Sequence, residues 1–290
     1  MPDTHLPSDA TLEAERTQRL TAERDAVERL VRLNGALELQ AAVLALLLPR
    51  GSQRALRAWR IESAGAPEAE AVREQIDALS GPARLPMFEQ LVSRLRGQPL
   101  ETRQALLEAT RRVMGARGVL RPIDRLHWLA MRQRLGGNAS GTTRAAATAE
   151  MSRLPQADVS AIAMFSAFLS RLVPVDASES AAPTAAGETS PGVAWYDAVM
   201  APWQARTDVP ACLPPDTDGL VHALHELQAM AWMQRPVLVR GWVVAAQRTS
   251  RYGRLGDAAA DALRLSCTLL DSPLPPELAR HYGELMPEKR

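Results

Sequence analysis

Residues 103–129 read RQALLEATRRVMGARGVLRPIDRLHWL. Apolar residues recur at helical spacing on both sides of Gly118, and this glycine marks a turn between two helices, which we expect over about 101–116 and 121–135. The alternation of polar and apolar residues that is typical of a half-buried strand is nearly absent from the chain. These patterns predict an all-α fold.

The same signals predict helices before and after this stretch. A charged N-terminal helix carries Leu20 and Leu30 at helical spacing and should end in a left-handed turn at Asn34–Gly35. The next segment, ALELQAAVLALLLP (residues 36–49), is apolar around most of its circumference, which predicts a helix buried on several sides. Further helices are expected over residues 52–63, 67–79, 84–96, 156–172, 193–204, 216–233, 235–249 and 257–271, and after Pro275–Pro276.

Two stretches have too little apolar character to contribute to a core. Residues 136–149, GGNASGTTRAAATA, are expected to form a surface loop, and the Ala/Ser/Thr/Pro-rich residues 173–192 a flexible linker. We therefore predict two helical lobes in a four-part chain: a charged N-terminal helix (1–35), a first lobe (36–172), the linker (173–192) and a second lobe (193–290).

The second lobe contains a segment with the same layout as residues 103–129. This segment, RPVLVRGWVVAAQRTSRYGRLGDAAADALRL, covers residues 235–265. Each segment places a glycine turn between two helices, Arg117–Gly118 in the first and Tyr252–Gly253 in the second, and both glycines are expected to need a positive φ. An acidic residue follows each turn, at Asp124 and Asp261. The pattern predicts duplicated helix-turn-helix units.

Composition narrows the class of protein. The 290 residues include 34 basic and 33 acidic side chains, so the net charge gives no reason to expect a nucleic-acid binder. Only one basic residue is a lysine, Lys289, and the others are arginines. The longest apolar run, residues 41–48, is far shorter than the roughly 20 residues of a membrane-spanning helix. The N-terminus has no secretory-signal pattern, which favours the cytoplasm. Cys212 and Cys267 predict neither a disulfide framework nor a thiolate zinc site.

Two segments resemble a known family. ARLPMFEQLVSRLR (83–96) and ADALRLSCTLLDSPLPPEL (260–278) look like parts of the cytosolic C-terminal region of HtpX-like integral-membrane zinc metallopeptidases, in which two TerB-like helical repeats follow the protease. The resemblance runs from about residue 37 to 277. It implies two lobes of divergent TerB-like repeats without the peptidase domain, and a regulatory or adaptor role beside a membrane protein or membrane protease.

The sequence lacks the HExxH motif of those peptidases, in which two histidines hold zinc and the glutamate activates water. The nearest string is HELQA (residues 225–229), with alanine at the second ligand position, and His222 lies one helical turn before His225. A metal-dependent hydrolase that uses these two histidines is one alternative. TerB-like repeats can hold a cation at an Asp-Gly turn, but Arg117 and Tyr252 occupy that position here, and we expect no metal at either turn.

The strongest local feature is a basic stretch over residues 101–136, where eight arginines stand against three acidic residues. One interpretation is an anion-facing surface for a protein partner, for membrane headgroups or for nucleic-acid phosphates, and the other is a solvated helical face. A smaller basic cluster contains Arg240, Arg248, Arg251 and Arg254. The candidate interaction face consists of Arg103, Arg111, Arg112, Arg117, Arg121, Arg125, Arg132 and Arg134.

The six tryptophans lie mostly beside apolar helix positions, which predicts packing in the core. No nucleophile elbow, P-loop or dinucleotide-binding glycine pattern occurs, and we expect no cofactor. We predict a cytoplasmic, non-catalytic adaptor that docks to a membrane-protein partner through the arginine-rich face. This adaptor would lie peripherally at the inner membrane and make weak contact with anionic lipid. The alternatives are the metal-dependent hydrolase at His222 and His225 and a nucleic-acid-associated protein that uses residues 101–136.

Overall fold

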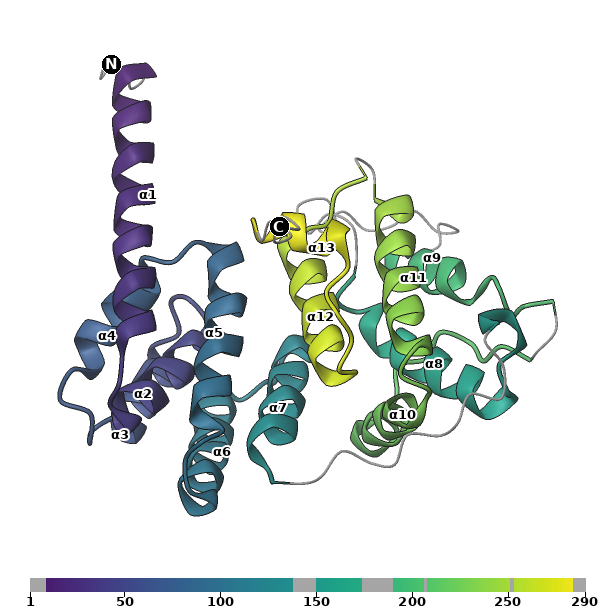
Figure 1. The fold of residues 1–290 in the computed structure, drawn as a ribbon, viewed down its shortest axis with the longest axis horizontal. Helices are drawn as coiled ribbons and strands as arrows, with labels where there is room; N and C mark the ends of the chain where they lie inside the picture. The colour runs from purple at the N-terminus through teal and green to yellow at the C-terminus, as the bar shows by residue number, and fades with distance from the viewer. Residues whose placement is uncertain (1–8, 138–149, 174–189, 206–207, 251–252, 284–290) are drawn as a thin grey trace, which may run out of the picture. The chain divides into compact units, whose positions relative to one another are not determined.

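The fold is all-α. The computed structural model describes residues 9–137, 150–173, 190–205, 208–250 and 253–283. Within these ranges every regular element is a helix: thirteen α-helices and one short 3-10 helix. Their bounds agree with the expected helices to within a few residues (Figure 1). None of the helices in these ranges combines the length and the apolar character needed to cross a membrane.

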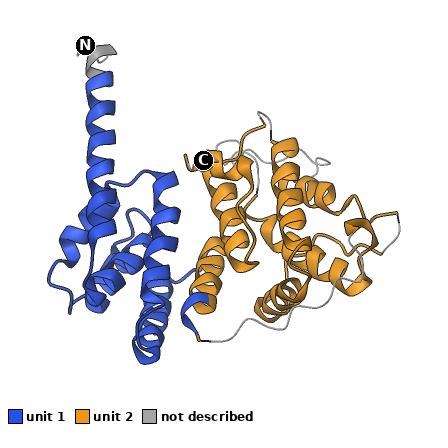
Figure 2. Cartoon of the chain, viewed as in Figure 1, with its two compact units in different colours: residues 1–119, 134–136 blue, residues 120–133, 137–290 orange. Residues whose placement is uncertain are grey.

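The chain divides into two compact units (Figure 2). The first contains residues 1–119 and 134–136, and the second contains residues 120–133 and 137–290. The sequence had instead predicted a division within residues 173–192. The difference arises because helix α8 (Gln156–Leu169), expected to close the first lobe, packs against two helices that follow it in the chain. Residues 138–149 and 174–189, which make up most of the expected loop and linker, lie outside the described ranges.

The first unit is built around α2. This helix packs against α3, α4, α5 and α6, and its residues 41–46 are all buried, which confirms the prediction of a helix buried on several sides. The C-terminal half of α1 packs on α4 through Ala26 and Leu30. The helices of this unit are α1 (Asp9–Arg32), α2 (Ala36–Leu46), α3 (Gln53–Glu62), α4 (Ala69–Asp77), α5 (Gly81–Leu95) and α6 (Leu100–Gly115).

The predicted left-handed turn at Asn34–Gly35 is wrong. Helix α1 does end just before it, but Gly35 has φ −70° and ψ 133° and is the N-cap of α2. The Glu38 carboxylate occupies the space of a Cβ at position 35, so Gly35 leaves room for this flexible side chain and has no positive φ. The end of α1 is held instead by Arg94, whose guanidinium donates to the carbonyl oxygens of Val31 (3.0 Å) and Leu33.

The second unit has α8 at its centre. Phe165 and Phe168 of α8 are fully buried, and the helix packs against α9 and α10. The Phe165 ring stacks on Trp242 of α11 with centroids 5.6 Å apart, and Trp242 donates to Ser166 Oγ at 3.0 Å. The other elements are α7 (Pro122–Leu135), the 3-10 helix Met151–Arg153, α9 (Pro191–Met200), α10 (Thr217–Ala229), α11 (Gln234–Thr249), α12 (Asp257–Leu269) and α13 (Pro276–His281).

Buried tryptophans connect helices by hydrogen bonds as well as by packing. Trp59 Nε1 donates to Ala41 O at 2.9 Å, and Trp195 Nε1 donates to Trp242 O at 3.2 Å. Four of the six tryptophans are buried, as expected: Trp59, Trp195, Trp203 and Trp242. Trp128 is half-buried, and Trp232 is 71% exposed, contrary to the expectation of a core position.

Both turn glycines have the expected positive φ, +84° at Gly118 and +64° at Gly253. The helices on either side of the two glycines nevertheless pack differently. Helices α11 and α12 pack against each other, whereas α6 and most of α7 belong to different units. The local turn is therefore repeated, but the packing of the two helix pairs is not the same.

Arginine contacts at helix ends generate a stability prediction. Arg84, half-buried on α5, donates to Ile76 O (3.0 Å) and Leu46 O (3.3 Å), which lie near the ends of α4 and α2. Arg84→Met leaves these carbonyls without the donor, and we expect it to lower the free energy of unfolding by about 1–3 kcal/mol. Urea unfolding followed by circular dichroism measures this, with Arg54→Met at an exposed position of α3 as the control. Equal stability of the two variants would contradict the prediction.

Candidate functional site

The eight arginines of the predicted interaction face are divided between the two units. Unit 1 contains the arginines on α6 and just after it, and one near the end of α7. Unit 2 contains one arginine just before α7 and two within it. The unit 1 residues are Arg103, Arg111, Arg112, Arg117 and Arg134, and the unit 2 residues are Arg121, Arg125 and Arg132.

Two arginines of α6 are used inside unit 1. Arg103 is half-buried, and its Nη1 donates to Leu135 O at 3.0 Å. Arg112 forms a two-pronged ion pair with Glu62 of α3, with Nε–Oε1 at 2.6 Å and Nη2–Oε2 at 2.8 Å. Arg111 is exposed, but neighbouring residues on a helix project about 100° apart, so Arg111 and Arg112 face different directions.

The pair between Arg112 and Glu62 changes the acidity of both groups. Hydrogen bonds from Arg112 lower the pKa of Glu62 below its ordinary value, and this effect exceeds the opposing effect of partial burial. The same hydrogen bonds raise the pKa of Arg112. Both side chains stay charged at neutral pH, and the positive charge of Arg112 is balanced within the fold.

In unit 2, Arg121 forms the N-terminal cap of α7 together with Asp124. The buried Asp124 carboxylate accepts from the Arg121 backbone N–H at 2.8 Å and from Arg121 Nη2 at 3.1 Å. The acidic residue after the second turn, Asp261, accepts from the Tyr282 hydroxyl at 2.8 Å. The two acidic residues that follow the glycine turns therefore have different structural roles. Tyr252, before the second glycine, lies outside the described residues.

The remaining arginines of the predicted face differ in exposure. Arg132 is exposed, whereas Arg117, Arg125 and Arg134 are half-buried. Arg103, Arg112 and Arg121 have the structural contacts given above. The structure thus does not gather the eight residues on one helix face, and part of the local basic excess serves helix ends and ion pairs.

The two histidines of the metal-hydrolase alternative are both exposed on α10. The Nδ1 atom of His225 lies 3.9 Å from Glu226 Oε1. Among the residues that the structure describes, no group of three or more histidine, cysteine, aspartate or glutamate side chains is placed to hold a metal ion. His222 and His225 therefore have no third ligand in this part of the chain.

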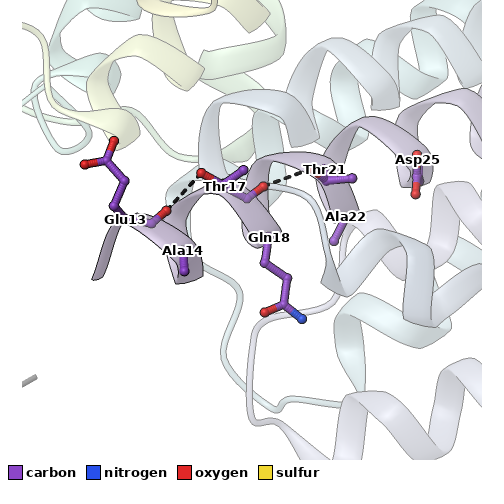
Figure 3. Close-up of a pocket in the computed structure, with 7 residues that line it drawn as sticks. All are labelled: Glu13, Ala14, Thr17, Gln18, Thr21, Ala22 and Asp25. Atoms are coloured by element: carbon purple, nitrogen blue, oxygen red, sulfur yellow. Dashed lines mark hydrogen bonds between the residues drawn. The ribbon is translucent and has the colours of Figure 1, made fainter. Parts of the chain in front are cut away.

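An open hollow lies along the exposed half of α1 (Figure 3). The residues that line it in the described part of the chain, from Glu13 to Asp25, all belong to this one helix. The hydroxyls of Thr17 and Thr21 donate to the carbonyls one turn earlier, Glu13 O and Thr17 O, both at 2.9 Å. The hollow is an open surface of alanine and polar side chains, and its threonine hydroxyls are already hydrogen-bonded.

An exposed apolar cluster at the start of α11 was not predicted from the sequence. Trp232 is 71% exposed, Met233 58% and Val237 55%. The opposite face of the same helix, with Leu238 and Trp242, is buried. A partial signal was present in the sequence: the apolar residues of the segment are not confined to one side, since Met233 and Val237 lie opposite Leu238 and Trp242.

The exposed face of α11 also carries the smaller basic cluster. Arg240 and Arg248 are exposed on the helix, and Arg254 is exposed after the Gly253 turn. Arg240 Nη2 lies 4.0 Å from Glu277 Oε1, at the limit of an ion pair. Arg251, which was predicted as part of this cluster, lies outside the described residues.

No protein-family model, curated protein or solved structure matches this chain.

The pair between Arg112 and Glu62 generates a pH prediction. Because the pKa of Glu62 is lowered in the folded state, the pair stabilises the fold above the ordinary glutamate pKa of 4.5 and loses this effect as pH falls through the lowered value. Arg112→Met should therefore lower the Tm at about pH 7, and the Tm difference from wild type should shrink toward about pH 3. Thermal unfolding of wild type, Arg112→Met and the control Arg57→Met across this range tests the prediction. A difference that persists at low pH would contradict it.

Proposed function

We propose that this chain is a non-catalytic helical interaction protein that binds a partner protein through the exposed face of α11. The observation that carries the proposal is the cluster of Trp232 and Met233, just before α11, and Val237, near its start, each more than half exposed. Tryptophan and methionine are enriched at protein interfaces, and tryptophan is frequent among the residues that dominate binding energy.

The physical gain from covering this cluster is substantial. A tryptophan side chain offers on the order of 150–250 Å² of surface, so burying the exposed part of Trp232 corresponds to roughly 3 kcal/mol at about 25 cal/mol per Å². This is a gross value, before the entropy lost on association. Ile61 of α3 is similarly exposed, 74%, but lies beside the charged Arg60 and Glu62 and offers no comparable apolar run.

The arrangement of polar groups supports binding more than chemistry. The candidate ligands His222 and His225 are exposed on α10 without a third ligand in the described part of the chain. The exposed arginines Arg111 and Arg132 are suited to attract an acidic partner at longer range.

The resemblance to the cytosolic region of HtpX-like peptidases supports the proposed repeats, partner and location of the chain. Under it, the two glycine-turn segments are TerB-like repeats, the partner is a membrane protein, and the chain acts on the cytosolic side of the inner membrane. These parts rest on sequence resemblance, whereas the binding face rests on the exposure of α11.

A quantitative partner comparison tests the function. Tagged full-length wild type, a Trp232→Ser/Val237→Ser variant and the matched control Ile61→Ser are recovered from detergent-solubilised host cells, and retained proteins are quantified by mass spectrometry. We expect a partner whose recovery falls by about tenfold or more with the α11 variant and is unchanged with the control, as for a buried anchor residue.

Two results would overturn the proposal. One is a set of retained proteins that is the same for wild type, the α11 variant and the control. The other is recovery of nucleic acid whose binding falls steeply with salt and depends on Arg111 and Arg132, because that dependence is the sign of phosphate contacts.

A further inference from the structure

Gly241 lies in the middle of α11, where glycine is among the least favourable residues for a helix. Nothing in the described structure requires it. A Cβ built at Gly241 meets no atom within 4 Å, whereas a Cβ at Gly192 would lie against the Ser170 carbonyl. Close packing of α9 beside the end of α8 explains Gly192, whereas no contact within the described structure explains Gly241.

Gly241 belongs to the same exposed strip as the apolar cluster. Met233, Val237, Gly241 and Val244 follow one another at intervals of four, four and three residues, so they share one side of the helix. The first three are exposed and Val244 is half-buried. The strip is apolar with a notch at its centre, and a helix packed across it can approach closely because interhelical distance depends on side-chain size at the crossing.

The charged side chains that α11 itself places along the strip are positive. Helix α11 contains no aspartate or glutamate, and Arg240 and Arg248 lie along the strip. The N-terminal turn beside Trp232 has neither an acidic residue nor a side-chain cap, which leaves the positive end of the helix dipole uncompensated there. Glu277 of α13 places one carboxylate near this face, with its Oε1 atom 4.0 Å from Arg240 Nη2.

We infer that the strip Met233–Val237–Gly241–Val244 is the docking site for an amphipathic helix of the partner that has acidic residues on the flanks of its apolar face. The inference rests on the proposed function, because it names the chemistry of that partner. Charge complementarity favours an acidic helix over a second copy of this chain, since a two-fold contact centred on Gly241 would bring Arg240 close to its own equivalent.

The test uses the full chain and two synthetic peptides. Each has about 20 residues, enough for a stable helix, with leucine at i, i+3, i+4 and i+7 spacing; one has glutamate at the flanking positions and the other has lysine. Binding is measured by fluorescence anisotropy up to about 100 µM protein. We expect the glutamate peptide to bind about tenfold or more tightly than the lysine peptide.

Variants of the chain locate the site. Gly241→Leu should weaken binding of the glutamate peptide by about tenfold or more without lowering the Tm, because the new side chain fills the notch and its Cβ meets no atom within 4 Å. The matched control is Gly115→Leu at the end of α6, where a Cβ also meets nothing within 4 Å. Arg240→Glu/Arg248→Glu should reverse the preference between the two peptides.

Several results would overturn the inference: no binding of either peptide, equal binding of both, or unchanged binding after Gly241→Leu. A dimer detected by sedimentation and abolished by Gly241→Leu would assign the strip to a second copy instead. If cellular partner capture still depends on Trp232 while neither peptide binds, the proposed function stands and the acidic-helix inference fails.

Discussion

Arginine side chains hold the helix ends of this protein, and the packing of both units depends on them. The last carbonyls of an α-helix have no partner within the helix, and a guanidinium carries five donors in a rigid fork. Arg84 and Arg94 serve α1, α2 and α4 in the first unit. In the second unit, the buried Arg235 donates to Met230 O at 3.1 Å and Leu270 O at 3.3 Å, and so connects the ends of α10 and α12.

These structural roles of arginine change the interpretation of the basic stretch over residues 101–136. In a chain with one lysine, nearly all the lysine and arginine side chains that can close helices and balance carboxylates are guanidinium groups. Arg103 donates to the last carbonyl of α7, and Arg112 is paired with Glu62. A local excess of arginine is therefore weak evidence for an anion-binding surface here, and exposed apolar residues are the stronger indication of a binding site.

Helix α11 has a structural role, and we propose that it also has a binding role. Its buried face carries Trp242 into the core beside Phe165, which fixes the helix against its own unit. Its outer face presents Trp232 and an open position at Gly241 to solvent. A rigid helix with one anchored face is a suitable platform for a partner helix, because little conformational entropy is lost on its side of the interface.

Local sequence patterns were sufficient to predict the helices and the positive φ at Gly118 and Gly253, because periodicity, caps and turns depend on residues close together in the chain. The same patterns could not show that α8 belongs with the later helices, that Arg103 reaches the end of α7, or that Trp232 lies in solvent. Those features are set by contacts between residues far apart in the sequence. Which apolar residues of a helix stay in solvent is therefore decided only when the helices pack.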